Sequence, residues 1–268
     1  MILAVDIGNT SVNLGLFTGE KLTCRMKLAS DPMKTADEYA AVISAIFAMK
    51  KIDVSEITGA ILLSVVPGLT HSLTLALGEA GIHPMVVGAG IRTGLNIRVE
   101  NPSALGSDIV ADTVGAMHIA EPPFAVVDFG TATTITAVDP EGVLRGCIIA
   151  PGVKLSHDAL SKSCAMLPDV PLSAPEKLLG ANTADSMNSG SVYGSALMLD
   201  GFINRLRAEY GERLTVIATG GLSELIVPFC ASRIIREPDL TLCGLLRLYE
   251  LNTRPKKNQK GARSLSEE

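Results

Sequence analysis

One short pattern occurs twice in this chain: an apolar run ends in an aspartate, which a glycine and a threonine follow. The first copy contains Asp6 in ILAVDIGNTSVNLGLF, and the second contains Asp128, 122 residues later, in FAVVDFGTATTITAV. Each copy is typical of a strand, a tight turn and a second strand, because apolar, β-branched runs flank turn-forming residues. Two hairpins with an acid at the same place indicate an internal duplication, and we predict two similar α/β lobes.

Strand and helix patterns alternate between the two hairpins. An amphipathic helix is expected over 35–49, where Thr35 and Glu38 form a capping box. After it we expect a strand, a helix and a strand, over 59–68, 69–81 and 84–90. In the second half, a helix is expected over 191–211, followed by the strand TVIAT and a further helix. This alternation predicts sheets with helices packed on their faces.

Two prolines mark the expected boundary between the lobes. A helix over about 107–120 is interrupted by the Pro-Pro pair at 122–123. We therefore expect an N-terminal lobe over 1–121 and a C-terminal lobe over 122–250. Residues 251–268 lack apolar periodicity, which is typical of a disordered tail.

Composition narrows the class of protein. With 47% hydrophobic residues the chain can bury a core, and a net charge of −5 gives no basic field for nucleic acid or an anionic membrane. No apolar run reaches the roughly 18 residues of a membrane span, and Met1 leads directly into the first strand without a secretory pattern. The cysteines are odd in number and form no CxxC pair, which favours reduced thiols. We expect a cytoplasmic protein without nucleic-acid or membrane partners.

The two hairpin turns carry residues suited to a polyphosphate. An aspartate at a strand end can hold a hydrated Mg²⁺, and a glycine lets backbone N–H groups approach phosphoryl oxygens. Either turn alone is as well explained by ordinary hairpin chemistry. Together, Asp6 and Asp128 predict a site in which the two turns bind a polyphosphate from opposite sides. Fold stability does not require acids at buried strand ends, which favours a functional role for both.

A third turn, Thr219-Gly220-Gly221, follows an apolar strand and precedes an expected helix. Alone, this pattern is best explained as a tight strand-to-helix turn. Together with the two phosphate loops, it is expected to form the part of the nucleotide site that contacts the adenosine, with Gly220 and Gly221 close to the nucleotide. The GxxxxGK[ST] and GxGxxG patterns are absent, which excludes a P-loop and a dinucleotide site. The histidines show no triad or metal spacing, and we interpret most of them as surface or structural residues. ATP in a cleft between two lobes is the remaining interpretation.

Asp108 is the other acid of interest. Gly106 precedes a helical run and Asp108 falls in its first turn, where a carboxylate could be a general base for a substrate hydroxyl. Capping of the helix by Ser107 or Asp108 explains the same pattern equally well.

Several segments in order resemble the type III pantothenate kinases, and they span most of the chain. They are DIGNT at 6–10, SVVP at 64–67, ENP at 100–102, GSD at 106–108, DFGTATT at 128–134, IAPG at 149–152, GANTADSMNSG at 180–190 and TGG at 219–221. The resemblance implies two RNase H-like lobes of the actin/hexokinase/Hsp70 class with a nucleotide cleft between them. It also implies phosphorylation of pantothenate by ATP, the first step of coenzyme A synthesis, in a homodimer.

The resemblance also implies individual roles. ATP would be contacted by Asp6, Ile7, Gly8, Asn9, Thr10, Ser11, Val12, Asn13 and Thr131. Pantothenate would be contacted by Gly106, Ser107, Asp108, Ile109 and Thr183. Asp108 would be the general base, Asp6 would hold Mg²⁺ through water, and Asp128 would bind a monovalent cation, K⁺ or NH₄⁺.

The sequence departs from the family pattern in the substrate region. Ile109 stands where an arginine usually follows the aspartate, Asp112 stands for an asparagine, and Cys147 stands for a glycine. An arginine there would pair with the pantothenate carboxylate, a contact worth about 1.5–3 kcal/mol. Three explanations remain open: weak pantothenate binding, compensation by Lys154 or Arg145, or an ATP-binding paralogue with a different or lost substrate.

Overall fold

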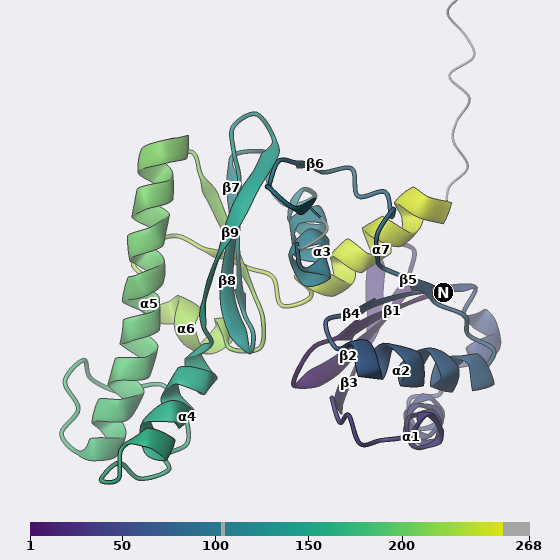
Figure 1. The fold of residues 1–268 in the computed structure, drawn as a ribbon, viewed down its shortest axis with the longest axis horizontal. Helices are drawn as coiled ribbons and strands as arrows, with labels where there is room; N and C mark the ends of the chain where they lie inside the picture. Colours follow the sequence, from purple (N-terminus) through teal and green to yellow (C-terminus); the bar gives the residue numbers. More distant parts are fainter. Residues whose placement is uncertain (103–104, 254–268) are drawn as a thin grey trace, which may run out of the picture.

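The computed structural model describes residues 1–102 and 105–253, which form two sheets with helices on both sides of each (Figure 1). The first sheet has the strand order β3-β2-β1-β4-β5. Its strands are β1 (Ile2–Ile7), β2 (Ser11–Thr18), β3 (Lys21–Ala29), β4 (Gly59–Ser64) and β5 (Met85–Val86). Helices α1 (Ala36–Met49) and α2 (Pro67–Glu79) cover one face, and the 3₁₀ helix η1 (Val54–Glu56) precedes β4.

The second sheet has the strand order β11-β10-β7-β8-β9-β6. Its strands are β6 (Asn96–Ile97), β7 (Phe124–Phe129), β8 (Ala132–Val138), β9 (Val143–Pro151), β10 (Thr215–Thr219) and β11 (Ile235–Arg236). The helices on its outer face are α4 (Val153–Ser163), α5 (Thr183–Tyr210) and α6 (Ser223–Ile226), with the 3₁₀ helix η3 (Val227–Phe229) after them.

The predicted duplication is confirmed by the topology. The first sheet runs β3-β2-β1-β4-β5, and the second contains the matching run β9-β8-β7-β10-β11. In each, the strand with the aspartate is antiparallel to the next strand and parallel to its other neighbour. Asp6 and Asp128 are both the penultimate residues of these strands, so the same geometry delivers both acids to the same edge of their sheets.

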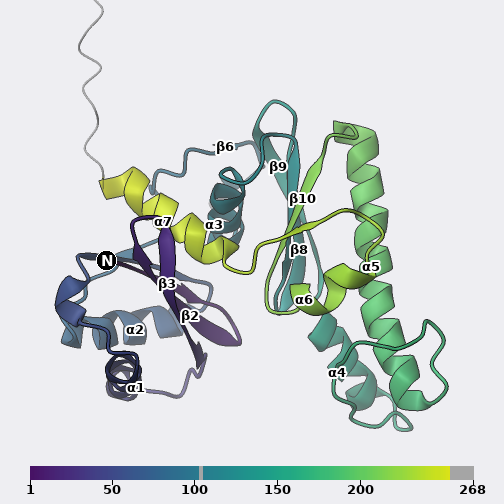
Figure 2. The same cartoon turned by 180° about the vertical axis from the view of Figure 1, so that it is seen from behind.

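Two helices fill the space between the sheets: α3 (Ser107–Ala116) and α7 (Leu240–Thr253), as Figures 1 and 2 show from opposite sides. Their apolar residues pack against both sheets, which makes one continuous interior across the two lobes. The helices touch closely because glycines face each other. A Cβ on Gly244 would lie 1.9 Å from the Ala111 carbonyl oxygen, and one on Gly115 would lie 2.6 Å from the Leu240 carbonyl oxygen.

Most of the expected elements are present with shifted ends. The capping box of Thr35 and Glu38 is confirmed, and α5 starts earlier than expected, at Thr183. Helix α3 ends at Ala116, four residues before the expected end, and the helix after β10 has only four residues. Helix α4 was not predicted. Within the described residues, no helix is both long and apolar enough to cross a bilayer.

The lobes are not continuous stretches of chain. Strand β6 precedes the expected boundary yet pairs with β9 of the second sheet, and α7 follows it yet packs against the first sheet. We still propose 121/122 as the division between the duplicated units, since it separates their hairpins. The expected tail begins too early: residues 251–253 end helix α7, where Asn252 exchanges hydrogen bonds with the backbone of Arg92. The rest of that tail, 254–268, lies outside the described residues.

Candidate active site

The two hairpin turns meet between the lobes. Thr10 Oγ1 and Thr131 Oγ1 lie 3.0 Å apart and share a hydrogen bond, although 121 residues separate them in the chain. Each turn is closed by its glycine: Gly8 N–H donates to the Ser11 carbonyl, and Gly130 N–H donates to the Ala132 carbonyl. The paired threonines are exposed, so both hydroxyls and the turn backbone are accessible to a ligand.

Two further glycines pack against the second turn. Gly220 has φ +86°, and a Cβ there would lie 2.2 Å from Asp128 Oδ1 and 2.6 Å from the Phe129 backbone. A Cβ on Gly152 would lie 2.1 Å from the Thr131 carbonyl oxygen. The sequence assigned Gly220 to the site but gave Gly152 no role; the signal was its place directly after a strand and before a helix. Only glycines allow these turns to approach one another.

Four aspartates gather beside these turns: Asp6, Asp128 and, one turn apart on α3, Asp108 and Asp112. Burial raises the pKa of Asp6 to about 6; the hydrogen bond from Asn13 Nδ2, 3.0 Å from Asp6 Oδ2, lowers it, and the charge of Asp108 raises it. Burial, followed by the charges of Asp108 and Asp6, raises the pKa of Asp128 to about 7. Within residues 1–102 and 105–253, none of the four is ion-paired with a basic side chain. This group of acids is therefore suited to cations.

Asp108 lies in the first turn of α3 but is not the N-cap residue. The N-cap of α3 is Gly106, with no side-chain cap bond. Ser107 Oγ donates to the Ser64 carbonyl at 3.4 Å, and Asp108 Oδ1 accepts a hydrogen bond from the adjacent N–H of Ile109 at 2.8 Å. Neither side chain is the N-cap, but the bond from Ile109 N–H and the place in the first turn are also those of a carboxylate that stabilises a helix start. A half-buried carboxylate at a helix start, beside two phosphate-type turns, can accept a proton from a substrate hydroxyl.

Comparison with known proteins agrees with this geometry. The sequence profile of the type III pantothenate kinases matches residues 2–205. The chain belongs to this family. A type III pantothenate kinase of Moorella thermoacetica is 43% identical over 94% of this chain and 100% of its own length. That of Agathobacter rectalis is 37% identical over 98% and 100%.

Solved structures share the fold at low sequence identity. The activator of the 2-hydroxyisocaproyl-CoA dehydratase from Clostridium difficile, solved with bound ADPNP, has a TM-score of 0.51 at 11% identity, over 93% of this chain and 94% of that one. The ethanolamine utilization protein EutJ from Carboxydothermus hydrogenoformans has a TM-score of 0.50 at 15% identity, over 91% and 88%. These likenesses support the duplicated two-lobed fold of the family.

The two bases considered as substitutes for an arginine at position 109 are both ion-paired with other acids. Ile109 is 6% exposed and is one of the buried side chains of α3. Arg145 is ion-paired with Asp139 at 2.5 Å, and Lys154 with Asp158 at 2.9 Å. Both bases are therefore engaged within the second lobe.

Thr183, expected to contact pantothenate, is not brought to Asp108 within one chain. It is the first residue of α5, whose N-cap is Asn182. Side chains from the first turns of α5 bond to α4 and to the segment before α5. Figures 1 and 2 both place this end of α5 beside α4 and well away from α3. The predicted substrate residues 106–109 therefore lie together, and Thr183 lies apart from them.

Asp6 and its surroundings fit a divalent cation that is held mainly by the phosphates of a bound nucleotide and by water. Among the described residues, no group of three or more His, Cys, Asp or Glu side chains could hold a metal ion. Mg²⁺ commonly keeps several waters and takes one or two carboxylates together with substrate phosphates. Asp6, with one oxygen held by Asn13, suits that arrangement.

Asp112 belongs to the framework of the site. It is 4% exposed and its Oδ1 accepts a hydrogen bond from Thr241 Oγ1 of α7 at 2.6 Å. Burial, followed by the charge of Asp128, raises the pKa of Asp112 well above its usual value. Asp112 therefore links α3 to α7 through the Thr241 hydroxyl, in surroundings that favour its protonated form.

We expect Asp112→Asn to stabilise the protein, and the gain to grow as the pH rises. A raised pKa contributes stability that is complete below the unfolded value of 3.8 and is lost as pH rises through the folded value. The amide accepts the Thr241 bond and never ionises. For a chain of this size, Tm rises about 2–4 °C per kcal/mol. Melting curves at pH 5 and pH 8 check this, and an equal gain at both would contradict it.

Proposed function

We propose that the protein transfers the γ-phosphoryl group of ATP to the hydroxyl of pantothenate, giving 4′-phosphopantothenate in the first step of coenzyme A synthesis. The observation that carries this proposal is the place of Asp108, half-buried in the first turn of α3 beside the joined turns of the two lobes. Identities of 37–43% over nearly the full length of pantothenate kinases argue against a non-catalytic paralogue or one with another substrate.

In this mechanism the chain positions two reactants and compensates charge. Asp108 accepts the proton of the attacking hydroxyl, while Gly106 and Ser107 lie against the substrate. The turn between β1 and β2, within residues 6–13, and the hydroxyls of Thr10 and Thr131 face the phosphates, and Gly220 and Gly221 border the adenosine. Mg²⁺, held by Asp6 through water, would neutralise charge on the phosphoryl oxygens.

Asp128 is our proposed site for K⁺ or NH₄⁺. Its carboxylate lies among other acids without a basic partner in the described residues, and burial, followed by the charges of Asp108 and Asp6, raises its pKa to about 7; a bound cation would offset both effects. Because the proton and the cation compete for this carboxylate, activation by K⁺ should weaken as the pH falls below about 7.

A homodimer in the cytoplasm completes the proposal. Thr183 is remote from Asp108 in one chain, so a second copy would have to bring the start of α5 to the cleft. Large apolar side chains are exposed on α4, α5, β9 and the segment between α4 and α5, as a subunit contact requires: Ile149, Leu155, Met166, Leu178, Leu179 and Leu197. All five cysteines are free thiols, as in a reducing compartment.

The proposal is tested by ADP release with Mg²⁺ and pantothenate in either K⁺ or Na⁺. We expect turnover that depends on pantothenate and is faster in K⁺. The matched control is the alcohol analogue, in which CH₂OH replaces the pantothenate carboxylate. Because Ile109 supplies no cation, the two substrates should differ in KM by less than the ten- to hundredfold that a charged pair would give. Nucleotide binding without pantothenate-dependent ADP release would refute the proposal.

A further inference from the structure

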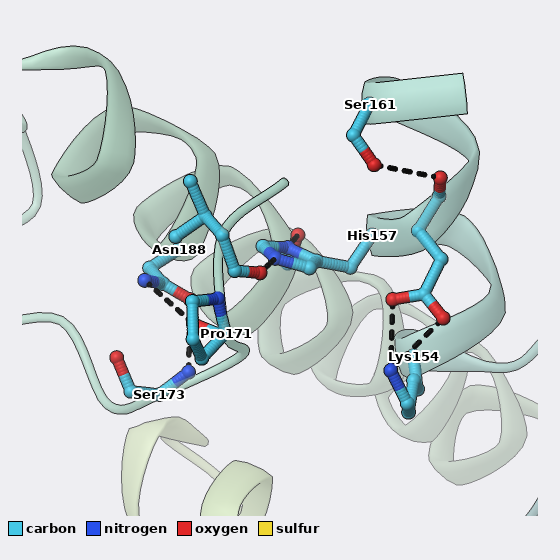
Figure 3. Close-up of polar contacts among 9 residues, drawn as sticks. Lys154, His157, Ser161, Pro171, Ser173 and Asn188 are labelled. Carbon is cyan, nitrogen blue, oxygen red and sulfur yellow. Dashed lines mark hydrogen bonds and ion pairs between the residues drawn. The ribbon is translucent and has the colours of Figure 1, made fainter. Parts of the chain in front are cut away.

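His157 lies at a junction of three segments in the second lobe. It is on α4 and 2% exposed; its Nδ1 is 2.8 Å from Ser191 Oγ of α5, and its Nε2 is 2.8 Å from the Val170 carbonyl oxygen (Figure 3). A carbonyl can only accept, so Nε2 carries the hydrogen. In the neutral ring, Nδ1 then accepts from the Ser191 hydroxyl. One buried imidazole thus joins α4, α5 and the segment between them.

That segment, 164–182, contains no helix or strand, yet buried side chains hold its backbone. Asn188 Oδ1 accepts from Ser173 N–H at 2.9 Å, and Asn188 Nδ2 donates to the Pro171 carbonyl at 3.3 Å (Figure 3). Ser189 Oγ donates to the Leu178 carbonyl. Asn188 and Ser189 are 7% and 5% exposed. Long segments without secondary structure are usually functional or mobile, and this one is tied down along its length.

Such anchoring indicates that the segment is held in one particular conformation. Buried polar groups cost free energy unless bonded, and a fully bonded network specifies a single arrangement. The segment ends at Asn182, which caps α5 directly before Thr183. The anchors therefore hold the segment that leads into the N-cap of α5 and the first residue of that helix, Thr183.

We propose that His157 is a positioning residue for pantothenate binding, because it fixes the 164–182 segment that leads into Thr183. This inference rests on the proposed function and on the substrate contact of Thr183. It assigns His157 no contact with substrate and no proton transfer. Loss of His157 should therefore weaken the binding of pantothenate. It should leave ATP binding and the catalytic step nearly unchanged, because the ATP turns and Asp108 lie elsewhere in the molecule.

The test compares His157→Leu, which removes both bonds, with His157→Gln, whose amide can donate to Val170 and accept from Ser191. The Leu variant should raise the pantothenate KM about tenfold or more, with kcat and the ATP KM within about twofold of wild type. Amide hydrogen exchange over 170–182 should rise in parallel. The Gln variant should restore both. Ser191→Ala, which removes one bond, should give a smaller KM rise and keeps the test informative if the Leu variant does not fold.

The outcomes separate this role from the proposed function. A wild-type enzyme that forms no phosphopantothenate would refute the function, and this role with it. An active wild type whose Leu variant keeps its pantothenate KM while exchange rises would overturn the positioning role alone. A Leu variant in which kcat and both KM values change together would also overturn it, because that pattern reflects general loss of structure.

Discussion

Asp108→Asn is expected to lower kcat for pantothenate phosphorylation about 10²–10⁴-fold and to leave the affinity for ATP within about twofold. The amide has nearly the same shape and can keep the local bond from Ile109 N–H, but it cannot accept the proton of the attacking hydroxyl. Single-turnover kinetics and nucleotide titration separate the two effects.

The matched control is Asp37→Asn. Asp37 is the second residue of α1, as Asp108 is of α3, and it is exposed on the surface. A carboxylate at such a position stabilises the helix by about 0.3–1 kcal/mol through its interaction with the helix dipole. If Asp108→Asn lowers Tm as little as Asp37→Asn and leaves kcat unchanged, Asp108 is a helix-start residue and its assignment as base is wrong.

Gly220→Ala is expected to abolish nucleotide binding and to destabilise the protein. A residue with a Cβ at φ +86° is strained, at a cost of about 1–3 kcal/mol, and the added atom would lie 2.2 Å from Asp128 Oδ1. Asp128 and the second phosphate turn must therefore shift. We expect Tm to fall by about 2–4 °C for each kcal/mol lost, measured by thermal denaturation with and without ATP.

Gly221→Ala is the control for this change. A Cβ on Gly221 has no heavy atom within 4 Å, and its φ lies outside the strained region. Its effect on stability should stay within about 0.5 kcal/mol. Equal Tm values for the two alanine variants would contradict the packing of Gly220 against the second turn.

The features that could be predicted from the sequence are those that local residue patterns determine. The two hairpins, the capping box of Thr35 and Glu38 and the turn glycines follow from periodicity and from backbone preferences near each residue. The turns predicted to bind ATP and Asp108 also lie close together, because a duplicated topology delivers the ends of β1 and β7 to equivalent edges of their sheets.

Contacts between distant segments could not be predicted. The pairing of β6 with the second sheet and the return of α7 to the first depend on burial across the whole molecule, which no local window contains. Asp112 bonds to Thr241, 129 residues away, so nothing near it in the sequence indicated a buried acid that links two helices. His157 gave no motif, because its partners are a hydroxyl and a backbone carbonyl.

The most direct test of the central claim is mass analysis of the product formed by the purified wild-type protein with ATP, Mg²⁺, K⁺ and pantothenate. The account predicts 4′-phosphopantothenate, with one ADP released for each molecule formed, and its near absence when Asp108→Asn replaces the wild type. A protein that binds ATP but leaves pantothenate unmodified at saturating concentration would contradict it.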